Sequence, residues 1–149
     1  MSQAIRIQIR VFLIVSLLLS MNTSFSQDKE VKEVIKQASE FFENQEYLEA
    51  KDLYSQLVSL YPKDANFNYR FGACLIAVDE DKTYPLKFLE YAVSRPNVEI
   101  DAFYFLGKGY HYNYRFDEAI RYFNKYKSKL DAKSRSLYPV DQDIRFCEN

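Results

Sequence analysis

The spacing of apolar and small positions predicts a chain of helices after an N-terminal apolar run. Small and large apolar residues recur at steps of three and four, which place them on one face of a helix. We expect helices over residues 28–44, 47–60, 65–78, 84–94, 99–112 and 116–129. A last apolar stripe consists of Leu137, Val140, Ile144 and Cys147. It predicts a short seventh helix with Pro139 in its first turn.

Polar residues at the predicted helix starts are candidate N-caps. The side-chain oxygen of such a residue accepts a hydrogen bond from one of the first backbone N–H groups of the helix. Asp28 and Asp64 precede the first and third predicted helices. Thr83 precedes the fourth, with Pro85 in its first turn, and Asn97 precedes the fifth.

The chain after the N-terminal apolar run repeats itself with a period of 34 or 35 residues. Ala38, Gly72 and Gly107 stand 34 and 35 residues apart. Glycine at such a position allows a second helix to approach too closely for a side chain. A second set of four recurs after 69 residues, with Tyr47, Ala50, Tyr54 and Leu57 matched by Phe116, Ala119, Phe123 and Tyr126. The pattern indicates repeated pairs of closely packed helices.

These positions resemble the tetratricopeptide repeat (TPR), a helix–turn–helix unit of 34 residues with small and aromatic side chains at fixed places. The resemblance implies an all-α, right-handed α-solenoid of about three TPR units in residues 27–133. The units are 31–64, 65–99 and 100–133, and residues 134–149 would form a capping helix. Pro85 stands where the family has a small residue, so the second unit departs from the pattern. An ordinary helical bundle with coincidental spacing is the alternative.

Residues 1–26 are predicted to be a secretory signal peptide. Arg6 and Arg10 precede an apolar run of 11 residues, Val11 to Met21, and small residues lead to Ser26. The alternative, a membrane anchor, requires a longer run, because 11 helical residues span about 17 Å of a hydrocarbon layer about 30 Å thick. We expect cleavage after Ser26 and an exported, periplasmic or outer-membrane-associated protein.

Composition and charge exclude several other classes of function. Lys and Arg number 20 and Asp and Glu 21, which is not the strongly basic balance of nucleic-acid-binding proteins. His111 is the single histidine, and with 3 glycines there is no phosphate-binding loop. We therefore predict no catalytic residue, no cofactor and no metal, and the protein is not expected to be an enzyme. Cys74 and Cys147 either form a disulfide in an oxidising compartment or remain free thiols.

The TPR resemblance also implies a binding site, since the first helices of successive units line a concave groove in this family. Tyrosine and arginine suit such a site because they combine large contact area with polar ends. Transfer of the unit positions gives these groove residues: Asn66, Tyr69, Arg70, Tyr104, Lys108, His111 and Tyr112. Several of the rings could instead belong to the core. The family's clamp for a terminal carboxylate is not predicted, because only Arg70 is basic among its equivalents and Asp101 would repel the ligand.

The export signal combined with repeats is similar to the N-terminal TPR segment of larger OmpA-like outer-membrane-associated bacterial proteins. The likeness lies in FNYRFGACL, YFLGKGYHYNYRFDEAIRYFNKYK and DIRFCEN. It implies an exported scaffold or adaptor that binds a protein or peptide in the cell envelope, with no nucleic-acid partner and no stable membrane span after signal cleavage. The alternatives are a structural subunit of an envelope secretion or assembly complex that binds through another face, a truncated fragment of an OmpA-like protein, and a chaperone-like holdase.

Overall fold

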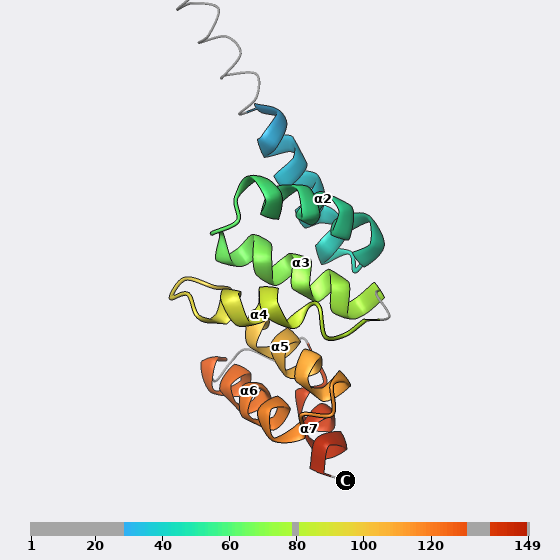
Figure 1. Ribbon diagram of the computed structural model, residues 1–149, viewed down its shortest axis with the longest axis vertical. Coiled ribbons are helices and arrows are strands. Elements are labelled where there is room, and N and C mark those ends of the chain that lie inside the picture. The colour runs from blue at the N-terminus through green and yellow to red at the C-terminus, as the bar shows by residue number, and fades with distance from the viewer. Residues whose placement is uncertain (1–28, 79–80, 131–137, 149) are drawn as a thin grey trace, which may run out of the picture. The chain divides into compact units, whose positions relative to one another are not determined.

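The computed structural model describes residues 29–78, 81–130 and 138–148, and these residues form helices and turns without a strand (Figure 1). The chain divides into two compact units, residues 1–36 and 37–149. In the first, the described residues 29–36 are helical. In the second, helical residues 37–43 are followed by α2 (Tyr47–Leu60), α3 (Ala65–Val78), α4 (Leu86–Val93), α5 (Asp101–Tyr112), α6 (Phe116–Lys129) and α7 (Val140–Glu148).

Helices α2, α3 and α6 have the predicted bounds, and the first helix is found over residues 29–43. Asp28, the proposed cap of that helix, lies outside the described residues. The predicted cap of α3 is confirmed, because Asp64 Oδ1 accepts a hydrogen bond of 2.9 Å from the backbone N–H of Phe67. The predicted starts of α4 and α5 are wrong by two residues each.

The start of α4 differs because Thr83 is not its cap. Asp81 Oδ1 accepts hydrogen bonds from the backbone N–H groups of Thr83, at 2.8 Å, and of Tyr84, at 3.3 Å. The Thr83 hydroxyl donates instead to Asn113 Oδ1. Pro85 has no N–H group, and its carbonyl accepts from the backbone N–H of Leu89 as the helix begins. A local Asx turn therefore replaces the predicted cap.

The start of α5 depends on Asn66, a residue of α3. The backbone N–H of Glu99 donates to Asn66 Oδ1 at 2.9 Å, so Asn97 is not the cap. The carbonyl oxygens of Glu99 and Ile100 then accept from Ala102 and Phe103, each three residues ahead. This tight turn explains why the α-helix itself begins at Asp101.

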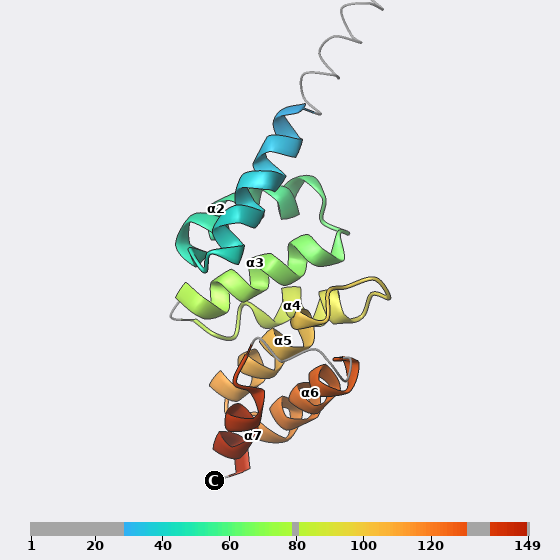
Figure 2. The same cartoon turned by 180° about the vertical axis from the view of Figure 1, so that it is seen from behind.

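The helices of the second unit stack in chain order (Figures 1 and 2). Each of α2 to α6 packs against the next, and α3 also packs against α5, so equivalent helices of successive pairs touch. A Cβ atom on Gly72 would lie 2.7 Å from Leu89 Cγ, and one on Gly107 would lie 2.5 Å from Phe123 Cδ1. The close approach predicted at these two glycines is confirmed, and the second unit is an all-α solenoid of helical repeats.

Helix α7 closes the stack by packing against α6 and α5. Val140, Asp143 and Cys147 form its buried face, which contains two members of the predicted apolar stripe. Leu137 lies outside the described residues. Pro139 immediately precedes the helix, and its carbonyl accepts from the backbone N–H of Asp143.

The two cysteines are free thiols, so the disulfide alternative is wrong. Cys74 lies in α3 with none of its surface exposed, whereas Cys147 lies in α7. Burial raises the pKa of the Cys74 thiol to about 12, which keeps it protonated at neutral pH. Cys74 therefore acts as a small apolar core residue.

Candidate protein-binding groove

A row of aromatic rings connects the first helices of the repeats. Phe42, Tyr69 of α3 and Phe105 of α5 have ring centroids 5.8–6.3 Å apart. Tyr138, just before α7, lies 5.3 Å from Phe105 and stacks on Tyr104 at 4.2 Å. Edge and stacked contacts of this kind add to the energy of burial. These rings form a continuous aromatic floor across the first helices of the repeats.

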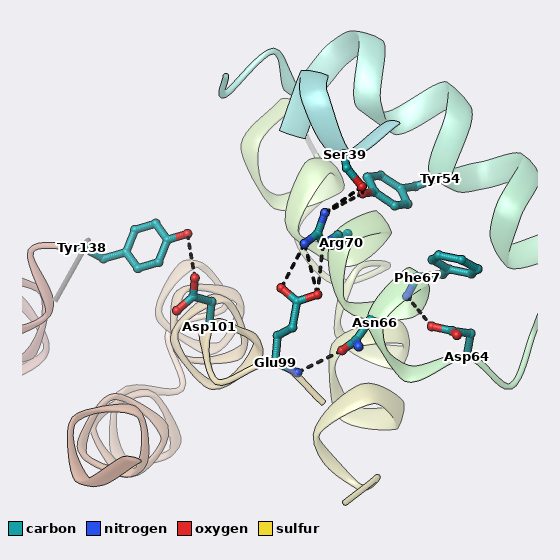
Figure 3. Close-up of polar contacts among 9 residues, drawn as sticks. All are labelled: Ser39, Tyr54, Asp64, Asn66, Phe67, Arg70, Glu99, Asp101 and Tyr138. Atoms are coloured by element: carbon teal, nitrogen blue, oxygen red, sulfur yellow. Dashed lines mark hydrogen bonds and ion pairs between the residues drawn. The ribbon is translucent and has the colours of Figure 1, made fainter. Parts of the chain in front are cut away.

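Arg70 joins three parts of the stack from its position on α3 (Figure 3). Its Nη1 donates to Tyr54 Oη at 3.0 Å and to Ser39 Oγ at 3.2 Å. On the other side, Nε and Nη2 donate to the two carboxylate oxygens of Glu99 at 3.2 and 3.1 Å. Burial alone would lower the pKa of Arg70, but the hydrogen bonds to Tyr54 and Glu99 raise it above its ordinary value. The guanidinium is therefore permanently charged and fixed in orientation.

Asn66 holds Glu99 in place for this contact. It lies one turn before Arg70 on α3, and its side-chain oxygen accepts the Glu99 backbone N–H, as Figure 3 shows. The two predicted groove residues Asn66 and Arg70 thus bind the same residue, one through its backbone and one through its carboxylate. Both contacts join α3 to the residue two positions before α5.

A first cavity of about 390 Å³ lies beside Arg70. Its walls combine aromatic rings with charged and polar groups: Phe42, Glu43, Gln45, Tyr47, Tyr69, Arg70, Glu99, Asp101 and Tyr138. The Tyr138 hydroxyl donates to Asp101 Oδ2 at 3.5 Å. Burial, and secondly the nearby Glu99 carboxylate, raise the pKa of Asp101 above its ordinary value. The cavity is thus an aromatic pocket with carboxylates in its wall.

A second cavity of about 490 Å³ adjoins the first, because Gln45, Tyr47 and Tyr138 line both. Its other lining residues are Ile76, Ala77, Lys82, Tyr104, Phe105, Lys108, Tyr112 and Pro139. The ammonium groups of Lys82 and Lys108 lie 5.7 and 5.0 Å from the centre of the Tyr112 ring. The two cavities form one groove with acidic groups in one part and basic groups in the other.

Helix α7 covers part of the face that the sequence assigned to a partner. Asp143 of α7, only 4% exposed, accepts a hydrogen bond of 2.7 Å from the Tyr104 hydroxyl and one of 3.1 Å from Lys108 Nζ. Burial and the hydrogen bond to Asp143 raise the pKa of Tyr104. Tyr104 and Lys108 therefore dock the capping helix as well as line the second cavity.

His111 also faces α7. Its Nδ1 lies 3.1 Å from Cys147 Sγ, within hydrogen-bonding distance. Burial, followed by the charge of Lys108, lowers the pKa of His111 below its ordinary 6.5, so the neutral ring is favoured. The residues that line the two cavities do not include His111.

The structure thus distributes six of the seven predicted groove residues among three places. Tyr69 and Arg70 line the first cavity, Tyr104, Lys108 and Tyr112 line the second, and His111 packs against α7. Tyr69 and Tyr104 are at most 5% exposed, whereas Tyr112 is 43% exposed. Asn66 lies outside both cavities.

Sequence reasoning missed several lining residues that lie outside the first helices of the repeats. Gln45 comes from the turn before α2, and Tyr47 is the first residue of α2. Lys82 comes from the turn after α3, and Tyr138 precedes α7. The sequence pattern identifies Tyr47 only as a repeat position. A positive φ of 63° at Gln45 shapes the turn, but no sequence signal marked it.

Among the described residues, no group of three or more His, Cys, Asp or Glu side chains is arranged to hold a metal ion. In the same part of the chain, no helix combines the length and apolar composition required to cross a membrane.

No protein-family model and no curated protein matches this sequence. Solved structures do match. The crystal structure of the MamA protein aligns with a TM-score of 0.63 and 23% identity, over 78% of this chain and 61% of that one. The crystal structure of the P58(IPK) TPR domain aligns with a TM-score of 0.67 and 15% identity, over 85% of this chain and 35% of that one. The chain thus spans less than two thirds of either structure. At these identities the likeness concerns the fold, and it shows that the chain has the TPR type of helical-repeat architecture.

Proposed function

We propose that this protein is an exported scaffold or adaptor of the bacterial cell envelope that holds a protein partner mainly in its concave groove. The observation that carries the proposal is the pair of adjoining cavities of about 390 and 490 Å³. Volumes of this size fall in the range of about 300–1,000 Å³ that is common for ligand sites. Because the two cavities share a wall, successive side chains of one extended segment would enter both of them.

The composition of the groove supports a protein ligand. Aromatic side chains and arginine are enriched in the parts of interfaces that contribute most to affinity. Here the rings of Tyr47, Tyr112 and Tyr138 line the groove, with Arg70 fixed at one end. Because the aromatic floor is already packed, a partner would lose little energy in ordering it.

The proposed location rests on the sequence. Residues 1–26 have the basic start, apolar run and small exit residues of a secretory signal. These residues lie outside the described part of the structure. Mass spectrometry of the protein recovered from the envelope would test this assignment, with Gln27 expected as the first residue.

The groove is tested by filling it. Ala77 is exposed and lines the second cavity, so Ala77→Arg places a long side chain in the groove without removing a core contact. Gln56→Arg, at an exposed position on α2, is the matched control. Each tagged full-length protein would be used for affinity capture from the native envelope fraction. A defined partner lost with Ala77→Arg and retained with Gln56→Arg supports the proposal.

A second candidate, a structural subunit of an envelope complex that binds through another face, is favoured by exposed rings near the end of the stack. Tyr114, in the turn between α5 and α6, is 83% exposed, and Phe146 of α7 is 58% exposed. A partner retained by Ala77→Arg but lost with Tyr114→Asn and Phe146→Ser would select this function and reject the groove.

A further inference from the structure

We infer that the first cavity receives a lysine or arginine side chain of the partner segment. The inference deepens the proposed function, because it assumes that the groove holds a protein. It rests on the charges and rings that surround this cavity and on their existing contacts.

The charge balance of the first cavity is negative. Glu43, Glu99 and Asp101 supply three carboxylates to its wall, and Arg70 supplies one guanidinium, so the formal charge is −2. The second cavity has no carboxylate among its lining residues and contains Lys82 and Lys108. A cationic side chain is therefore attracted to the first cavity rather than to the second.

Arg70 does not balance all of this charge. Its guanidinium is directed at Glu99 on one side and at Tyr54 and Ser39 on the other, and its side chain is 17% exposed. Asp101 instead accepts a hydrogen bond of 3.5 Å from the Tyr138 hydroxyl and a second one from the Tyr126 side chain, both of which are neutral donors. Figure 3 shows the Asp101 carboxylate beside the Tyr138 hydroxyl and separate from the Arg70 contacts. An incoming cation would supply Asp101 with an ionic partner.

The rings around the cavity suit the same ligand. A cation is attracted to the face of an aromatic ring when it lies within about 6 Å of the ring centre. Arg70 already makes such a contact, with its guanidinium carbon 5.2 Å from the centre of the Phe42 ring. Tyr47, Tyr69 and Tyr138 complete the aromatic wall, so the aliphatic part of a lysine or arginine would also be buried.

The test uses pools of acetylated, amidated heptapeptides with one fixed central residue. The flanking positions are mixtures of Ala, Leu, Ser and Phe, and the central residue is Lys, Arg, norleucine or Glu. Binding to the full-length protein is measured by competition with a fluorescent Lys-centred pool. We expect the Lys and Arg pools to bind at least tenfold more tightly than the norleucine and Glu pools.

Substitution of the two carboxylates of the first cavity that Arg70 does not bind, Glu43 and Asp101, locates the effect. Glu43→Gln with Asp101→Asn should abolish the tenfold preference, whereas the control Glu49→Gln with Asp52→Asn, on exposed positions of α2, should retain it. Circular dichroism of each variant is the control for folding. Equal binding of all pools, absence of binding, or a preference that survives the first double substitution would each overturn the inference. The proposed function fails separately, when envelope capture is insensitive to Ala77→Arg.

Discussion

At the scale of single residues, the fold depends on positions where a helix has no room for a Cβ atom. On Gly107 the added atom would meet the Phe123 ring at 2.5 Å, and on Gly109 it would meet Leu86 Cδ2 at 2.8 Å. The two sites differ in what must move. An aromatic ring packed at 0% exposure cannot shift easily, whereas the end of a leucine side chain can change rotamer.

We predict that Gly107→Ala destabilises the protein by about 1–2 kcal/mol, because overpacking against Phe123 outweighs the better helix propensity of alanine. Gly109→Ala, on the same helix, is the control and should change stability by less than about 1 kcal/mol. Urea unfolding followed by circular dichroism measures both. Equal stability of the two variants would contradict the assignment of Gly107 as the close-contact site.

At the scale of elements, α7 is held by a buried polar contact and an exposed one. Asp143 binds Tyr104 and Lys108 on α5, whereas Asp141 pairs with Lys127 on α6. The first carboxylate is nearly inaccessible to water, and the second is 66% exposed. Ion pairs at exposed positions contribute little, but a buried carboxylate that loses its cation is costly.

We predict that Lys108→Met reduces the free energy of unfolding by about 3 kcal/mol, since Asp143 would remain buried without the cation that it binds. Lys127→Met removes a lysine that also contacts α7 and should cost less than about 1 kcal/mol. Urea unfolding of both variants at neutral pH makes the comparison. Similar losses for the two substitutions would show that the Asp143 contact does not secure the cap.

At the scale of the whole second unit, cooperativity depends on contacts that pass between repeats. Arg70 is one such contact, because it binds Ser39 and Tyr54 on one side and Glu99 on the other. In a repeat stack, each repeat is stabilised by its neighbours, so weaker coupling lets the stack unfold in parts.

We predict that Arg70→Met lowers the free energy of unfolding by about 1–3 kcal/mol and makes the urea transition less steep. Native-state hydrogen exchange should show α2 losing protection before α5, because the bridge between them is removed. Arg121→Met, at an exposed position on α6, is the control. A transition of unchanged steepness in Arg70→Met would indicate that ring packing alone couples the repeats.

The sequence by itself determined the helices and their pairing. The recurrence of Gly72 and Gly107, with Leu89 and Phe123 opposite them, reflects a local requirement for close packing, and such requirements leave a period in the sequence. A helix and its cap are governed by residues only a few positions apart. The sequence could therefore predict the bounds of α2, α3 and α6 and the Asp64 cap.

Only the tertiary structure decided what the groove contains. Asn66 and Arg70 bind Glu99, about 30 residues away, and Asp143 of α7 binds Tyr104 and Lys108. The bonding partner of a polar side chain depends on which distant helix lies opposite it, and helical periodicity reports only which face the side chain occupies. The sequence could therefore identify the face of each helix, while the stacking of the repeats determined which of its side chains hold the fold and which remain available to a ligand.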